Sequence, residues 1–251
     1  MENAPSPNRL YIVPCMLTIC SLFSGFYSII AAINGHFFAS AVAILVAGVF
    51  DGLDGRVARM TGSTSSFGME LDSLCDMVAF GVAPALLAYL WALTPYGRYG
   101  WLAAFLYVAA TALRLARFNS QIEVSPSHDF TGLPCPAAAG VIATAVMFSS
   151  NVFNTTSTVQ HLSLLVLISL LSYLRVSTHR YASFKHMDIP RDKRFQLFIG
   201  LILLLILLAS DPPKTLFPAL FLYSLSGLVM ALRTRVGRKK VKAAGPKDRP
   251  L

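Results

Sequence analysis

Four aspartates at helical spacing are the residues of this chain whose types and positions point most clearly to chemistry. Asp51 and Asp54 are three residues apart, and Asp72 and Asp76 are four apart, so each pair lies on one face of a helix. Apolar stretches flank both pairs, and a carboxylate at membrane depth is costly unless it has a function. We therefore expect the four carboxylates to form a functional site.

A bend between the two pairs would allow their faces to meet. If residues 60–67 form this bend, the four carboxylates gather, and at low dielectric constant their charges repel strongly. Divalent cations would remove that repulsion. An all-oxygen ligand set without His or paired Cys favours Mg²⁺ or Mn²⁺ over Zn²⁺. The alternative is a buried polar network that only joins two helices, and such a network does not need four carboxylates.

The chain that must position these carboxylates has the composition of a membrane protein. Of its 251 residues, 55% are hydrophobic and only 13% are charged. Several apolar stretches approach the roughly 20 residues that cross a bilayer. We predict an all-α, polytopic membrane protein with about eight transmembrane helices. Their predicted positions are residues 10–33, 37–56, 67–93, 100–117, 136–150, 160–177, 195–210 and 215–232.

The distribution of Lys and Arg predicts the orientation of these helices. With a cytoplasmic N-terminus, nearly all of the basic residues, Arg175 and the C-terminal tail included, fall on the cytoplasmic side. Only Arg98 and Lys214 fall outside, as the positive-inside rule favours. The net charge of +9 is then mostly a feature of topology that also suits an anionic leaflet, and we expect no nucleic-acid partner.

The aspartates and the residues between them resemble the signature of the CDP-alcohol phosphatidyltransferases. The pattern D-x2-D-G-x2-A-R-x8-G-x3-D-x3-D is met at every fixed position from Asp51 to Asp76. The resemblance implies two Mg²⁺ or Mn²⁺ ions held by Asp51, Asp54, Asp72 and Asp76 near the cytoplasmic face. It also implies that Asp76 accepts the proton of an acceptor hydroxyl.

The same resemblance implies which residues bind CDP-diacylglycerol. They are Thr18, Gly55, Arg59 and Gly68. Arg59 could hold a phosphate with its guanidinium fork, or extend idly to the membrane surface. Thr18 follows a stretch in which Cys15 replaces the asparagine common in the family, and its hydroxyl could instead bond to a carbonyl of its own helix.

Three further stretches, residues 73–84, 114–119 and 130–140, resemble the serine-using branch of this family. The resemblance implies transfer of a phosphatidyl group from CDP-diacylglycerol to L-serine, with release of CMP. Candidates for binding serine or phosphate are Arg114, Arg117, Asn119 and Thr131. The alternative for the two arginines is ordinary positive charge at a cytoplasmic helix end.

The resemblance also implies a homodimer in the cell (inner) membrane, and the distribution of Lys and Arg predicts that both termini lie in the cytoplasm. The predicted division is an N-terminal segment, a transmembrane phosphatidyltransferase domain and a basic tail, at residues 1–9, 10–235 and 236–251. One alternative is the same reaction with glycerol 3-phosphate, inositol phosphate or choline as acceptor. Another is a divalent-cation or proton-coupled transporter. Transporters often contain paired repeats, and the C-terminal half has no partner for the aspartate hairpin.

Overall fold

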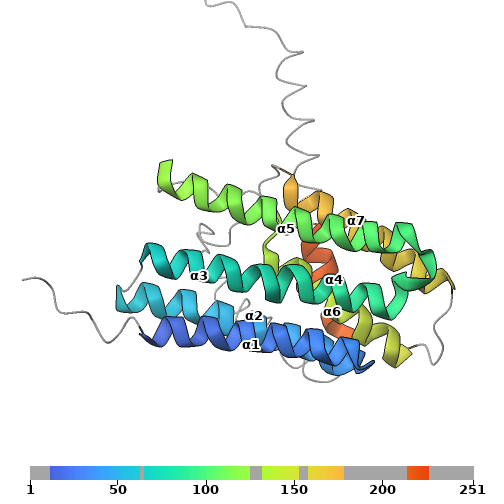
Figure 1. The fold of residues 1–251 in the computed structure, drawn as a ribbon. Coiled ribbons are helices and arrows are strands. Elements are labelled where there is room, and N and C mark those ends of the chain that lie inside the picture. The colour runs from blue at the N-terminus through green and yellow to red at the C-terminus, as the bar shows by residue number, and fades with distance from the viewer. Residues whose placement is uncertain (1–11, 63–64, 125–131, 153–157, 178–213, 226–251) are drawn as a thin grey trace, which may run out of the picture.

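The computed structural model describes residues 12–62, 65–124, 132–152, 158–177 and 214–225. All regular structure in these segments is helical, which confirms the predicted all-α class for the described part of the chain (Figure 1). The long helices are α1 (Ile12–Ile33), α2 (Phe37–Thr61), α3 (Ser66–Asp76), α5 (Arg98–Val124), α6 (Cys135–Val152) and α7 (Thr158–Val176). Between α3 and α5, the chain continues through η2 (Met77–Val82), α4 (Ala83–Ala88), η3 (Tyr89–Leu93) and η4 (Thr94–Tyr96).

Among the described residues, four helices are long and apolar enough to cross a membrane, as in a multi-pass membrane protein. They are Ile12–Ile33, Phe37–Thr61, Ser66–Tyr96 and Arg98–Ser120. Cys135–Ser150 and Leu162–Val176 are shorter apolar helices at the predicted fifth and sixth spans. The predicted seventh span lies outside the described residues, and only the first part of the eighth is described, as a helix at 214–225. The count of eight therefore stays a prediction.

The helices form a bundle in which the aspartate-bearing segments lie next to each other. In Figure 1, α1 and α2 lie side by side at the bottom, the α3–α4 segment lies above them, and α5 lies above that segment. One apolar cluster, which includes Ile44, Phe80 and Ala139, joins α2, η2 and α6. A second, which includes Tyr107 and Ile168, joins α5 and α7. The bundle is thus held together on both sides of the α3–α4 segment.

The bend between α2 and α3 is shorter than the predicted residues 60–67. Helix α2 ends at Gly62, whose φ of 62° places it in the left-handed region that glycine tolerates. Helix α3 begins after Ser65, whose side chain accepts a hydrogen bond of 3.0 Å from the Gly68 N–H. Both helices therefore reach into residues 60–67, the predicted bend, and are capped there at Gly62 and Ser65.

The helix that follows Asp76 passes through Pro84 by way of π-helical turns. Residues Met77–Val82 and Tyr89–Leu93 have π-helical geometry on either side of α4. Because Pro84 has no N–H, the carbonyl of Phe80 lacks its usual α-helical donor. Arg175 supplies a replacement, since its Nη2 lies 3.1 Å from the Phe80 carbonyl oxygen. A side chain from α7 thus binds the backbone one turn beyond Asp76.

Candidate active site

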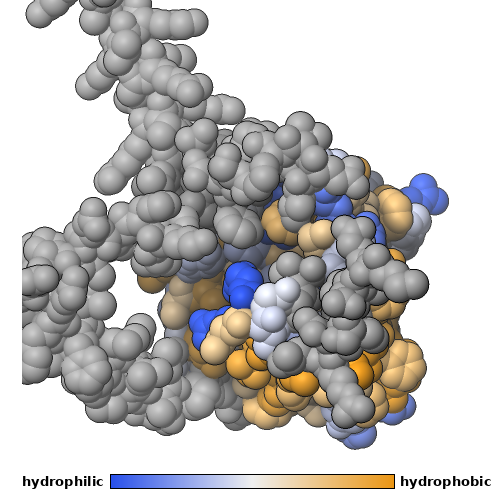
Figure 2. Space-filling view, turned by 90° about the vertical axis from the view of Figure 1, so that its left-hand side faces the viewer, coloured by the Kyte–Doolittle hydropathy of each residue, from blue (hydrophilic) through white to orange (hydrophobic). Residues whose placement is uncertain are grey.

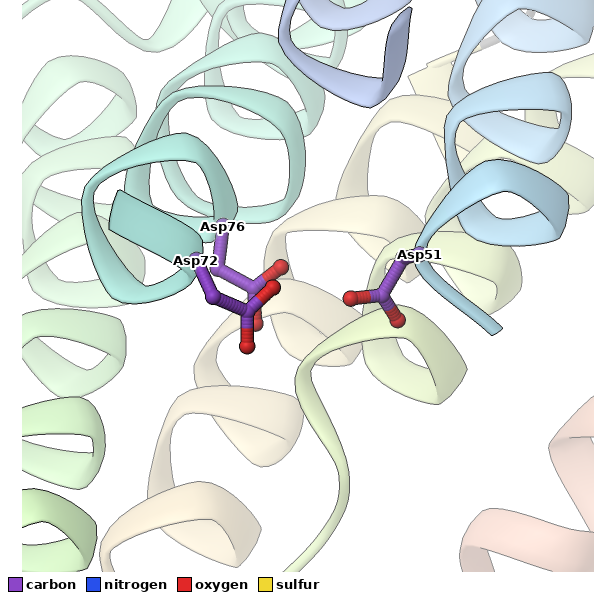
Figure 3. Close-up of side chains that lie close together, drawn as sticks. All are labelled: Asp51, Asp72 and Asp76. Carbon is purple, nitrogen blue, oxygen red and sulfur yellow. The ribbon is translucent and has the colours of Figure 1, made fainter. Parts of the chain in front are cut away.

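Three of the four aspartates meet between α2 and α3. Figure 3 shows Asp72 and Asp76 projecting from α3 toward Asp51 on α2. Each of the three can offer a carboxylate oxygen such that all the oxygens lie within 4.8 Å of one another, and all three residues are partly buried. The predicted approach of the two helix faces is therefore observed for these residues, and together they could hold a metal ion.

Asp54 lies outside this group of three and is tied to α1 instead. It is 5% exposed, and Thr18 Oγ1 lies 2.8 Å from its Oδ2. The same hydroxyl lies 3.0 Å from the carbonyl oxygen of Pro14. Because Thr18 has a single hydroxyl proton, it serves one acceptor at a time, and the bond to a carboxylate is the stronger. The predicted bond of Thr18 to a carbonyl of its own helix thus occurs, beside a bond to Asp54 that the sequence did not predict. Binding of CDP-diacylglycerol by Thr18 and of metal by Asp54 stay predictions.

A cavity of about 190 Å³ brings together all of the residues predicted to bind CDP-diacylglycerol. We name it the donor cavity, and its lining includes Thr18, Asp54, Gly55, Arg59, Gly68 and Asp72. The guanidinium of Arg59 folds back along α2, so that a Cβ placed on Gly55 would lie 3.9 Å from its Nη2. An exposed cation thus stands at this cavity beside an acidic cluster.

A second cavity, of about 310 Å³, also has Asp72 in its lining. We name it the acceptor cavity, and its lining includes Asp72, Ser73, Asp76, Arg114, Asn119 and Cys135. Asp72 and Met69 line both cavities. Two spaces of different composition therefore meet at the acidic cluster, one with Arg59 and the other with Arg114.

The structure separates the two arginines that the sequence places on one helix face. Arg114 lines the acceptor cavity and donates from Nη1 to the Cys135 sulfur at 3.1 Å. Its Nε is buried and has no hydrogen-bond partner within the described part of the chain. Arg117 is not among the described lining residues, and its Nη2 lies 3.5 Å from the carbonyl oxygen of Arg175.

The other two candidates for serine binding have different outcomes. Asn119 lines the acceptor cavity, where its side-chain amide pairs with the Ser73 hydroxyl at 3.0 and 3.2 Å. This pair joins the end of α5 to α3 beside Asp72. Sequence reasoning did not identify Ser73, although its place directly after Asp72 could have suggested it. Thr131 lies outside the described residues.

Comparison with known proteins places this arrangement in a family. The family model described as CDP-alcohol phosphatidyltransferase matches residues 11–168, which span α1 to most of α7. The chain belongs to the CDP-alcohol phosphatidyltransferase family. Both cavities and the acidic cluster lie within the matched residues.

Relatives of this phosphatidyltransferase chain come from bacteria and archaea. The CDP-diacylglycerol–serine O-phosphatidyltransferase of Helicobacter pylori is 37% identical over 222 residues, which are 88% of this chain and 92% of the relative. The protein of the same name from Bacillus subtilis is 38% identical over 69% of this chain and 91% of its own length. The archaetidylserine synthase of Methanothermobacter thermautotrophicus is 39% identical over 57% of this chain and 61% of its own.

The donor set of the acidic cluster fits a hard divalent cation. Carboxylate oxygens from Asp51, Asp72 and Asp76 converge, and these are the ligands that Mg²⁺ and related ions prefer. No His or Cys belongs to this group within the described part of the chain. The chemistry of the residues is thus consistent with the divalent metal that this family generally uses.

Arg175, which the sequence analysis counted among the cytoplasmic charges, is not an exposed helix-end charge, and its side of the membrane stays a prediction. It lies in the last turn of α7 with 0% of its surface exposed. Its guanidinium donates to the Tyr107 hydroxyl at 2.6 Å and to the carbonyl oxygens of Cys135 and Phe80 at 3.0 and 3.1 Å. An arginine after an apolar run has the sequence signal of a helix-end charge, so the sequence alone could not show that it turns inward.

Proposed function

We propose that this protein transfers the phosphatidyl group of CDP-diacylglycerol to L-serine, which gives phosphatidylserine and CMP. The observation that carries the proposal is the meeting of the two cavities at Asp72. One is lined by the candidate donor-binding residues, and the other by Asp76 and Arg114. The names of the relatives, which specify serine as acceptor, support the same reaction.

The donor cavity suits the diphosphate of CDP-diacylglycerol. Arg59 offers a guanidinium fork, which matches the geometry of phosphate oxygens. Asp51, Asp72 and Asp76, with Asp54 as a further candidate, would hold the Mg²⁺ or Mn²⁺. When bound, such ions offset negative charge on the diphosphate and on the leaving CMP. Thr18 keeps Asp54 in position through its hydrogen bond of 2.8 Å.

The acceptor cavity suits a small molecule with one carboxylate and one hydroxyl. The partnerless Nε of Arg114 can donate to the serine carboxylate together with a second guanidinium nitrogen. Asp76 accepts the proton of the serine hydroxyl. The hydroxyl oxygen then forms a bond to the phosphorus of the phosphatidyl group as the bond to CMP breaks. The Asn119–Ser73 pair holds the wall of the cavity beside Asp72.

The membrane setting follows from the two substrates. The acyl chains of the donor stay in lipid, whereas the cytidine group and serine arrive from water. Asp51 lies ten residues before the end of α2, which is about 15 Å along the axis. Figure 2 views the bundle from this end, where hydrophilic side chains lie beside a large apolar surface. We propose that this end faces the cytoplasm, and that the protein is a homodimer of the inner membrane with cytoplasmic termini.

The charge of the acceptor cavity favours serine over a phosphorylated acceptor. Among the described lining residues, Arg114 is the one cation, and Asp72 and Asp76 are already acidic. A phosphate group on the acceptor would add roughly two negative charges at neutral pH. Glycerol 3-phosphate or inositol phosphate would therefore need more basic residues than the described lining offers.

A panel of acceptors tests the proposed reaction directly. Purified protein with CDP-diacylglycerol and Mn²⁺ is incubated with L-serine, glycerol 3-phosphate, inositol phosphate or choline, and CMP release is measured. We expect release with L-serine alone, together with a lipid product that contains serine. Release with another acceptor and none with serine would refute the choice of acceptor, and no release with any of them would refute the reaction.

A further inference from the structure

Arg175 connects three parts of the bundle from a fully buried position. Its guanidinium donates to Cys135 in the first turn of α6, to Phe80 in η2 and to Tyr107 in α5. It also bonds to the hydroxyl of Thr111 and lies over the ring of Tyr107, with 4.0 Å from its central carbon to the ring centre. The helices on both sides of the acceptor cavity are therefore bound to one side chain.

Such burial is unusual for an arginine at a helix end. An arginine there normally extends its charged group to water, where the charge is solvated. Each hydrogen bond that the described structure gives to the Arg175 guanidinium goes to a neutral oxygen. Because no charge of opposite sign is among these partners, the oxygens must stay in place to offset the cost of burial. The partners are thus fixed relative to one another.

The backbone at the end of α7 also contacts the residues that lead into α6. The N–H of Leu133 lies 3.4 Å from the carbonyl oxygen of Leu174. Gly132 has a φ of 86°, and a Cβ there would lie 2.7 Å from the carbonyl oxygen of Arg175. The end of α7 therefore contacts residues 132–135 through its backbone and binds them through the Arg175 side chain.

Two of the hydrogen bonds of Arg175 connect it to residues that line the acceptor cavity. Cys135, whose carbonyl binds Arg175, accepts the hydrogen bond of Arg114 at its sulfur. Phe80, whose carbonyl also binds Arg175, follows Asp76 by four residues on the same helix. Arg175 thus bonds to Cys135, which holds Arg114, and to the helix that carries Asp76, and both Arg114 and Asp76 line the acceptor cavity.

We propose that Arg175 is a positioning residue for the acceptor, which sets the separation of Arg114 and Asp76 without touching the substrate. The inference rests on the proposed function, because it assumes that the acceptor occupies the cavity between these two residues. Loss of Arg175 should therefore impair use of serine. The donor cavity should be spared, since none of the partners of Arg175 lines it.

The test compares Arg175→Met and Arg175→Lys with Leu171→Ala in the full-length protein. Met keeps the apolar stem and removes every donor, whereas Lys keeps the charge but cannot reach several acceptors at once. Leu171 is equally buried on α7, and its truncation destabilises the bundle without removing a bond to Cys135. For each protein, KM for serine, KM for CDP-diacylglycerol and kcat are measured by CMP release, together with the unfolding temperature.

We expect the serine KM of Arg175→Met to rise by about tenfold or more, while the KM for CDP-diacylglycerol stays within about twofold. Arg175→Lys should fall between Met and the unchanged protein. Leu171→Ala should lower the unfolding temperature and leave both KM values nearly unchanged. This pattern separates positioning from general stability, because a purely structural role would move Leu171→Ala and Arg175→Met together.

Several results would overturn the proposal. They are an unchanged serine KM in Arg175→Met, equal rises in both KM values, and the same KM shift in Leu171→Ala. Failure of both Arg175 variants to fold would also overturn it, since the residue would then be only structural. If the unchanged protein releases CMP with an acceptor other than serine, the proposed function fails, and the KM for that acceptor still tests Arg175.

Discussion

Replacement of Arg114 by Lys tests whether the acceptor cavity recognises a carboxylate. Lys keeps the positive charge and loses the planar fork. In the structure, Nη1 of Arg114 is occupied by the Cys135 sulfur, whereas the buried Nε has no partner within the described residues. The nitrogens left for a carboxylate therefore form one bidentate pair, and a single ammonium group cannot reproduce both bonds.

The expected magnitude follows from the bond that is lost. A hydrogen bond to a charged group contributes about 1.5–3 kcal/mol. Loss of one such bond from a bidentate pair should raise the serine KM by about 10- to 100-fold, since roughly 1.4 kcal/mol is a factor of ten. The KM for CDP-diacylglycerol should change little, because Arg114 does not line the donor cavity.

Arg117→Lys is the matched control for this prediction. Arg117 lies one turn from Arg114, and its contact to the Arg175 carbonyl at 3.5 Å is at the limit of a hydrogen bond. We expect its serine KM to change by less than about threefold. Initial rates of CMP release at varied serine and varied CDP-diacylglycerol give all of these constants. The reasoning is refuted if Arg114→Lys raises only the KM for CDP-diacylglycerol, or if the two variants behave alike.

Four further outcomes are expected. Asp76→Asn should lower turnover by at least about a hundredfold while CDP-diacylglycerol still binds, because general-base catalysis is lost; near-normal CMP release in detergent would exclude that role. Activity should vanish with EDTA and return with Mg²⁺ or Mn²⁺ but not with Zn²⁺ alone, and full activity after exhaustive chelation would rule out metal dependence. Gly55→Ala should raise the KM for CDP-diacylglycerol, because Gly55 lines the donor cavity. It should not lower stability, since the nearest described atom to the new Cβ would be 3.9 Å away. Gly48→Ala, with its nearest described atom also at 3.9 Å, is the control that should leave this KM unchanged. Thr18→Val should lower the free energy of unfolding by about 1–3 kcal/mol in EDTA, because it leaves the buried Asp54 carboxylate short of a donor. A smaller decrease in the presence of Mn²⁺ would indicate that Asp54 binds metal, and an equal decrease would indicate that it does not.

The sequence predicted the helix hairpin because its signals are local. Spacing of three and four residues places two aspartates on each helix face, and Gly62 and Ser65 are typical residues at a helix end and a helix start. The bend was predicted too long, since apolar periodicity marks helix boundaries less sharply than the caps do.

Contacts between distant helices could not be predicted in the same way. Asp54 shares a face with Asp51, yet the position of α1 beside α2 gives it Thr18 as a partner. Arg114 and Arg117 also share a face, and α6 lies beside one whereas the end of α7 lies beside the other. Neither difference depends on spacing along the chain, so helix periodicity predicted equal roles for residues whose surroundings differ.

The placement of charge in this bundle argues that the site is completed by its ligands. Opposite charges attract most strongly where the dielectric constant is low, and a buried charge is costly without a partner. The carboxylates of the acidic cluster nevertheless face one another, while the guanidinium hydrogen bonds of Arg114 and Arg175 go to neutral atoms. Helices that served stability alone would gain by pairing these groups. We infer that this arrangement reserves a place for a cation beside the aspartates and, as proposed above, a place for the carboxylate of an acceptor at Arg114.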